Sequence, residues 1–226
     1  MKAEFWHESW QKNQIGFHLS EVHPLLRRHW AALDVMPGAH VFVPLCGKSL
    51  DILWLLQQGY QVSAVELSAL AIDAFLAEAG IVAERQDLGA LQCYSAPGLK
   101  LYCGDFFALQ AEHLAGVTVV YDRAALVALP PAMREHYCRH LLQLLAGREV
   151  QLLLITLEYD QALVAGPPHS VSSQEVAAHY GAVGIIQLLD ARLDAAPPPR
   201  FTAAGIPVLL EKAYQISLHG NTSEVD

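Results

Sequence analysis

The stretch VFVPLCGKSLD, residues 41 to 51, decides the fold of this chain. Its first three residues favour a β-strand that stops at Pro44. Leu50 to Gln58 then carries an apolar pattern with helical spacing, which Gly59 ends. A strand, a tight turn and a helix in this order form the first part of an alternating α/β fold.

The same alternation continues along the chain. Gln61 to Val65 predicts a second strand, and Ala69 to Ala79 predicts a helix that ends at Gly80. Later segments predict buried strands over 99–103, 117–121 and 150–156, helices over 131–147 and 172–180, and a final antiparallel pair over 183–189 and 208–218. We therefore expect an α/β fold built on a doubly wound, mostly parallel sheet.

Length and composition limit the classes of protein that this chain can belong to. At 226 residues, we expect one domain over residues 1–218, with short helices within 1–36 and a disordered tail over 219–226. A formal charge of −9 opposes a nucleic-acid partner, because such binding needs clustered Lys and Arg. Charged residues interrupt every apolar stretch and the beginning resembles no secretion signal, so we expect a cytoplasmic protein without a membrane partner. A monomer is the default expectation.

Two carboxylates are expected at the edge of the sheet where ligands bind. Glu66 follows the first turn by about twenty residues, the spacing at which an acidic side chain reaches a ribose hydroxyl. The alternative is that it caps the helix that begins near Ser68. Asp105, after the third strand, either accepts a hydrogen bond from an adenine amino group or serves as a turn residue.

The first turn itself excludes two common nucleotide loops. It has a single glycine, Gly47, where a dinucleotide fold has GxGxxG, and Phe42 takes the place of the first glycine of a P-loop. The turn therefore offers no evident diphosphate site. A nucleoside without phosphates fits better, and S-adenosylmethionine is one.

Several strings in order give the chain a specific resemblance. Together they resemble the thiopurine S-methyltransferase family, of bacterial type, over nearly the whole chain: FxPLCGKxxD (42–51), Val65-Glu66, Leu101-Tyr102-Cys103, DRAALVA (122–128), Gly166-Pro167-Pro168, with Phe5-Trp6 to Trp10, Gly16-Phe17-His18 and Gly205-Ile206 to Glu211-Lys212 at the two ends. The resemblance implies a seven-stranded, Rossmann-like methyltransferase sheet with an antiparallel C-terminal strand, N-terminal helices over the cofactor, and S-adenosylmethionine as that cofactor.

The resemblance also implies roles for particular residues. Trp10, Leu45, Glu66 and Arg123 become cofactor contacts, and Phe17 a wall against the acceptor's ring. Without the resemblance, the sequence would predict packing roles for Trp10 and Leu45. It would leave two roles open for Arg123, an ion pair with Asp122 or a cation that holds the cofactor carboxylate and the acceptor anion. Arg200 matches a second family arginine associated with the acceptor, although the residues that follow it depart from the family pattern.

Other reactive side chains receive no role in the chemistry. Cys46 as a nucleophile is disfavoured, since methyl transfer needs no covalent enzyme intermediate, and Lys48 stays unassigned. His136 and His140 share a helix face, but no third ligand is near in the sequence, so no metal is expected.

These observations lead to one function and two rivals. We expect transfer of methyl from S-adenosylmethionine to an aromatic or heterocyclic thiol, such as a thiopurine, with selenium and tellurium species as further acceptors and a metalloid response as a further role. Arg123 would stabilise the acceptor anion. The rivals are a noncatalytic nucleoside-binding regulatory module and an NAD-dependent oxidoreductase, which the missing glycines oppose.

Overall fold

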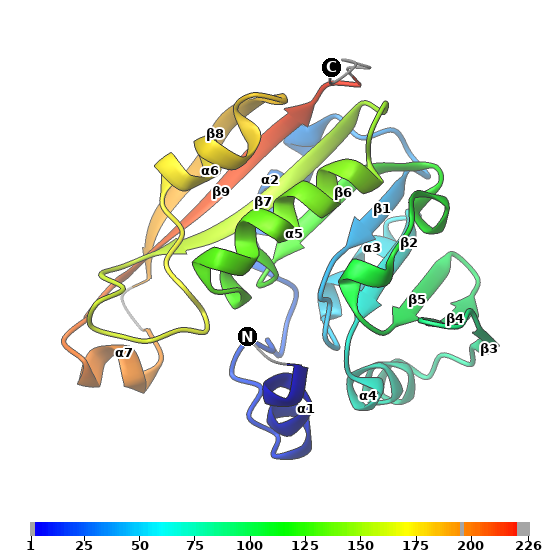
Figure 1. The fold of residues 1–226 in the computed structure, drawn as a ribbon, viewed down its shortest axis with the longest axis horizontal. Helices are drawn as coiled ribbons and strands as arrows, with labels where there is room; N and C mark the ends of the chain where they lie inside the picture. The colour runs from blue at the N-terminus through cyan, green and yellow to red at the C-terminus, as the bar shows by residue number, and fades with distance from the viewer. Residues whose placement is uncertain (1–2, 195–196, 221–226) are drawn as a thin grey trace. The chain divides into compact units, whose positions relative to one another are not determined.

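The computed structural model describes residues 3–194 and 197–220, and the chain divides after Tyr121 into two compact units. Figure 1 shows helices and strands in both units. The expectation of one domain over 1–218 stays a prediction. Of the predicted tail, residues 221–226 lie outside the described part, while the His219 N–H donates to the Val183 carbonyl at 3.1 Å.

The first unit contains most of the parallel sheet. Strands β5, β2, β1 and β6 run parallel, and β3 and β4 extend the sheet antiparallel beyond β5, in the order β3-β4-β5-β2-β1-β6. The elements are α1 (Ala3–Gln11), α2 (Pro24–His29), η1 (Trp30–Leu33), β1 (His40–Val43), α3 (Leu50–Gln57), β2 (Gln61–Glu66), α4 (Ala69–Ala79), β3 (Glu84–Asp87), β4 (Gln92–Ala96), β5 (Leu99–Cys103), η2 (Phe106–Ala108), η3 (Ala111–Leu114) and β6 (Val117–Arg123), which crosses into the second unit. The predicted strands and helices of this region are confirmed.

The β3–β4 hairpin was not predicted, and it makes the expected strand number wrong. All four residues of β3 are exposed and polar, so the strand has no apolar alternation by which it could be found. It forms through main-chain pairing with β4 and a turn in which Asp87 Oδ1 accepts the Gly89 N–H at 2.8 Å. The described residues hold nine strands instead of seven.

The second unit contains the antiparallel end of the fold. Its strand β9 lies between β7 and β8 and runs antiparallel to both, which confirms the predicted final pair. The elements are η4 (Leu126–Ala128), α5 (Pro131–Leu144), β7 (Val150–Glu158), α6 (Ser173–Tyr180), β8 (Gly184–Asp194), α7 (Pro199–Ala203) and β9 (Leu209–Leu218).

Asp51, the last residue of the opening motif, ties three elements of the first unit together. It is buried, and its two oxygens accept the backbone N–H of His23 at 2.8 Å and the Tyr121 hydroxyl at 2.9 Å. Its own N–H donates to the Ser49 side chain, which caps α3. Because a buried carboxylate is costly without partners, this motif position favours Asp.

Asp122 has a comparable position in the second unit. Its carboxyl is buried and accepts the Tyr137 hydroxyl at 2.7 Å and the Leu126 N–H at 3.1 Å. Burial raises the pKa of Asp122 to about 6, and the hydrogen bonds from Leu126 and Tyr137 oppose the rise. These bonds hold the start of η4 and the helix α5 to the end of β6.

None of the helices in the described part of the chain is long and apolar enough to cross a membrane.

The raised pKa of Asp122 predicts how stability depends on pH. The native carboxyl takes up a proton at about pH 6, whereas the unfolded one does so near pH 4, so the native state binds more protons between these values. The stability that this group contributes therefore falls as pH rises through that window, by roughly 3 kcal/mol. Asp122→Asn should lose this dependence, as urea unfolding at pH 4.5 and 7.5 would measure. Asp87→Asn, at an exposed position, is the control. If the unfolding free energy of Asp122→Asn depends on pH as that of the parent does, Asp122 is not the group responsible.

Candidate functional site

The carboxyl ends of three parallel strands meet at one edge of the first unit. The turn after β1 lies beside the end of β2, because the Cys46 N–H donates to the Val65 carbonyl at 2.9 Å. On the other side of β2, Glu66 is in register with Cys103 of β5. In open parallel sheets this edge is where ligands bind.

Glu66 lies at the centre of this edge, with 6% of its surface exposed. Its Oε2 accepts the Gly47 N–H at 2.9 Å and its Oε1 accepts the Ser68 N–H at 2.8 Å. Burial raises the pKa of Glu66, and the hydrogen bonds from the Ser68 and Gly47 N–H groups oppose that rise. The carboxylate thus holds both the turn and the start of α4, and each oxygen keeps a lone pair for a further donor.

The turn after β1 has a strained backbone at Leu45. Both Leu45, with φ 45°, and Gly47, with φ 54°, are in the left-handed region. Gly47 adopts it at no steric cost, but a leucine does so rarely. Such backbone strain gathers at functional sites, and it occurs here at the residue expected to contact the cofactor.

Two aromatic side chains lie against this turn. A Cβ on Gly47 would lie 3.2 Å from Trp10 Cζ2 and 3.7 Å from Phe17 Cε2, so both rings lie over the glycine. Trp10 and Phe17 meet edge to face with centroids 5.7 Å apart. The structure therefore brings four of the predicted residues, Trp10, Phe17, Leu45 and Glu66, to one place.

Ser68 is a residue of this edge for which the sequence predicts no role in ligand binding. It is the N-cap residue of α4, yet its side chain makes no capping bond, and its hydroxyl is buried without a partner among the described residues. A polar ligand at this edge would supply that partner. The acid of Glu66, the hydroxyl of Ser68 and the aromatic rings suit a ribose and a base, so the residues present fit a nucleoside cofactor.

Cys46 and Lys48 have structural roles in the turn. Burial, and then the negative charge of Glu66, raises the pKa of the Cys46 thiol well above its usual value. The thiol therefore stays protonated, as expected of a residue that is not a nucleophile. Lys48 pairs with Glu78 of α4, its Nζ lying 2.6 Å from Oε1, which ties the turn to that helix.

Asp105 is a turn residue in the structure, which is one of the two roles predicted for it. Its Oδ1 accepts the Phe107 N–H at 3.0 Å, so it caps η2, and the residue is exposed. An adenine contact by Asp105 stays a prediction.

The two predicted arginines belong to the second unit and are described by their neighbours there. Arg123 is the last residue of β6, and Ala124 after it has φ 62°, a second non-glycine residue in the left-handed region at a strand end. Arg200 of α7 donates through Nη2 to the Pro167 carbonyl and lies over the Phe201 ring, 4.9 Å from its centroid. Their roles toward a cofactor or an acceptor stay predictions.

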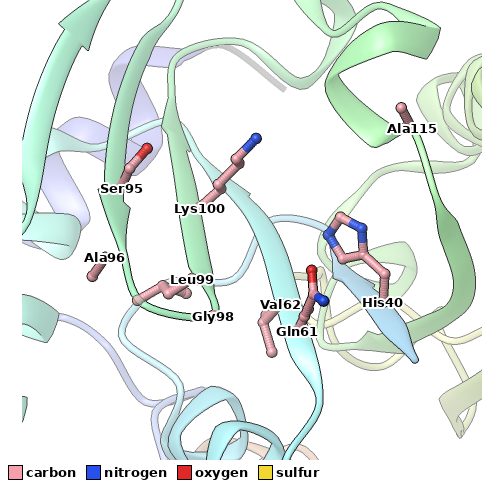
Figure 2. A pocket seen from close by; sticks show the side chains of 9 residues that line it. All are labelled: His40, Gln61, Val62, Ser95, Ala96, Gly98, Leu99, Lys100 and Ala115. Carbon is pink, nitrogen blue, oxygen red and sulfur yellow. The ribbon is translucent and has the colours of Figure 1, made fainter. Parts of the chain in front are cut away.

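A hollow at the opposite edge of the first unit is distinct from this site. Its volume is about 260 Å³, and it lies at the amino ends of β1, β2 and β5, where His40, Gln61 and Leu99 begin the strands. Figure 2 shows the Lys100 and His40 side chains beside it. Since the ligand edge of a parallel sheet is the carboxyl one, we place the candidate site at Glu66.

Sequence comparison gives consistent matches to one family. The family model described as thiopurine S-methyltransferase matches residues 1–219. A thiopurine S-methyltransferase of Pseudomonas entomophila is 47% identical over 219 residues, covering 96% of this chain and all of that protein. One of Nitrosospira multiformis is 48% identical over 220 residues, covering 95% and 97%.

Solved structures of low identity share the fold. The Burkholderia thailandensis 1,6-didemethyltoxoflavin-N1-methyltransferase, solved with S-adenosylhomocysteine, matches with a TM-score of 0.60 at 16% identity, covering 95% of this chain and 86% of that one. An S-adenosylmethionine-dependent methyltransferase of Anabaena variabilis matches with a TM-score of 0.60 at 14% identity, covering 96% and 95%. The fold is that of the S-adenosylmethionine-dependent methyltransferases.

The contact between Gly47 and Trp10 predicts a difference between two glycine variants. Gly38, with φ 76°, has nothing near its missing Cβ, so Gly38→Ala should cost only the backbone strain, about 1 to 2 kcal/mol. Gly47→Ala has the same strain and also displaces Trp10, so it should cost about 1 kcal/mol more and change the near-UV circular dichroism. If the two variants lose the same free energy of unfolding in urea and their near-UV spectra are unchanged, Trp10 does not pack against Gly47.

Proposed function

Because this chain belongs to the thiopurine S-methyltransferase family and its cofactor is S-adenosylmethionine, we propose that it methylates the sulfur of aromatic and heterocyclic thiols, thiopurines among them. The observation that carries the proposal is the buried Glu66 carboxylate at the end of β2, which accepts the Gly47 N–H, with the Trp10 and Phe17 rings against that glycine. The names of relatives at 47% and 48% identity support the choice of acceptor.

We assign the cofactor contacts to residues that lie at the turn. Glu66 accepts hydrogen bonds from the ribose hydroxyls through its remaining lone pairs, and Leu45 and Trp10 enclose the nucleoside. The Gly47 N–H is already bound to Glu66, so it is not available to a phosphate, which suits a cofactor that has none. When bound, S-adenosylmethionine supplies an electrophilic methyl group on a sulfonium.

The chain's own contribution to the reaction is alignment, exclusion of water and charge. Phe17 lies against the acceptor's ring, and the aromatic pair with Trp10 keeps water from the reacting atoms. Arg123 stabilises the acceptor thiolate and the cofactor carboxylate, and Arg200 acts at the acceptor side. A heteroaromatic thiol is already acidic, so no strong base is needed to remove its proton.

The proposal extends to the setting of the protein. We propose a cytoplasmic monomer that acts on small molecules and has no nucleic-acid or membrane partner. Selenium and tellurium species are further acceptors in this proposal, since their anions resemble a thiolate in softness and charge, and they would give the protein a role in the response to metalloids.

The test is methyl transfer from labelled S-adenosylmethionine to 6-mercaptopurine by the purified chain. We expect labelled S-methyl product and S-adenosylhomocysteine in equal amounts. Arg123→Met should lower kcat/KM for the thiol by about a hundredfold, since an anion loses its charged partner. Cofactor binding without product from any thiol, selenide or telluride would favour a noncatalytic nucleoside-binding module and contradict the proposal.

A further inference from the structure

The second unit contains a loop, residues 166–170, that we call the strap. Four consecutive residues of it are fixed by other parts of the unit. The Pro167 carbonyl accepts from Arg200, and the Pro168 carbonyl accepts from the Tyr159 hydroxyl at 2.7 Å. The His169 N–H donates to the Val127 carbonyl at 2.6 Å, and the Ser170 N–H donates to Gln161 Oε1 at 2.7 Å.

The residues that fix the strap are themselves held by packing. The Tyr159 ring meets Phe201 edge to face, with centroids 5.1 Å apart. Phe201 is completely buried in an apolar cluster with Val164, Ile206 and Leu209. The strap is therefore fixed in place by α7 and by the segment after β7, and Figure 1 shows these two segments at the same end of the second unit.

The strap lies where strands of the second unit end. Tyr159 follows Glu158, the last residue of β7. Val127, which holds His169, belongs to η4 and comes four residues after Arg123 at the end of β6. Since ligands of this fold bind beyond the carboxyl ends of the strands, the strap is placed to contact one.

His169 is the residue of the strap whose hydrogen bonding is incomplete. Its Nε2 is buried and has no partner among the described residues. Its ring lies against Gly166, where a Cβ would overlap it. Thr156 also carries a buried oxygen without a partner in the part of the chain that the structure describes, but this residue is completely buried in β7. His169 is half-buried in a loop at the ligand edge.

The imidazole of His169 is suited to a neutral hydrogen bond. Burial, and then the positive charge of Arg134, lowers the pKa of His169 below its usual value, so the ring is neutral at neutral pH. A neutral imidazole has one nitrogen that donates and one that accepts. A buried nitrogen without a partner is unfavourable, and a ligand that supplies the missing partner gains from it.

We propose that His169 determines acceptor specificity, and that its Nε2 forms a hydrogen bond with a ring nitrogen or ring N–H of a heteroaromatic thiol. Tyr159 and Arg200 are then positioning residues, because they hold the strap that presents the imidazole. The inference rests on the proposed function, since it names which thiols this site prefers.

The test uses two thiols that differ by one ring nitrogen, 2-mercaptopyridine and benzenethiol, with labelled S-adenosylmethionine as donor. For His169→Phe we expect kcat/KM to fall about tenfold for 2-mercaptopyridine and to stay within about twofold for benzenethiol. His169→Gln, which keeps a hydrogen-bonding group, should lose less. Gly166→Ala, which displaces the ring without removing it, should reproduce the selective loss.

The outcomes separate this inference from the proposed function. An equal change in kcat/KM for both thiols, or no change for either, in His169→Phe and Gly166→Ala overturns the specificity role while methyl transfer by the parent protein stands. If the parent methylates 6-mercaptopurine but neither of these two thiols, the proposed function stands and the inference is overturned, whereas if it methylates no thiol at all, both fail. Circular dichroism and the KM for S-adenosylmethionine establish whether each variant is folded. If His169→Phe does not fold, the ratio of kcat/KM for the two thiols in Gly166→Ala tests the inference.

Discussion

The carboxylate of Glu66 is the constraint on which the candidate site depends. It is buried, and a buried carboxylate is stable only where donors surround it. The chain provides these donors from two backbone N–H groups, of Gly47 in the turn after β1 and of Ser68 at the start of α4. One side chain therefore fixes the distance between the turn and the helix, and with it the shape of the edge where a ligand binds.

The conformation of the turn after β1 and the packing against it are linked to the bonds of Glu66. The left-handed backbone at Leu45 and Gly47 directs the Gly47 N–H to Glu66, and the missing side chain of Gly47 lets Trp10 and Phe17 close over the turn. Lys48 adds a second connection from the turn to α4 through Glu78. Lys48, a residue of the motif that had no assigned chemistry, thus helps to hold the turn against the helix whose start Glu66 binds.

The sequence allowed the alternating elements and the position of Glu66 to be predicted, because periodic apolar runs and the spacing from turn to acid have direct structural causes. It did not allow β3 to be predicted, since four exposed polar residues become a strand only by pairing with β4. The unpaired Ser68 hydroxyl had no signal in the sequence, where a serine before a helix indicates a cap. The bond from Arg200 to the Pro167 carbonyl of the strap joins residues 33 positions apart, and spacing in the sequence cannot reveal such a contact.

The most direct measurement of the central claim is the affinity of S-adenosylhomocysteine for Glu66→Ala, by calorimetry beside the parent and the exposed variant Glu84→Ala. If Glu66 holds the ribose of the cofactor, its loss should weaken binding by at least about tenfold, with Glu84→Ala equal to the parent. Equal affinity in folded Glu66→Ala and the parent would contradict the account, because the nucleoside would then be bound elsewhere.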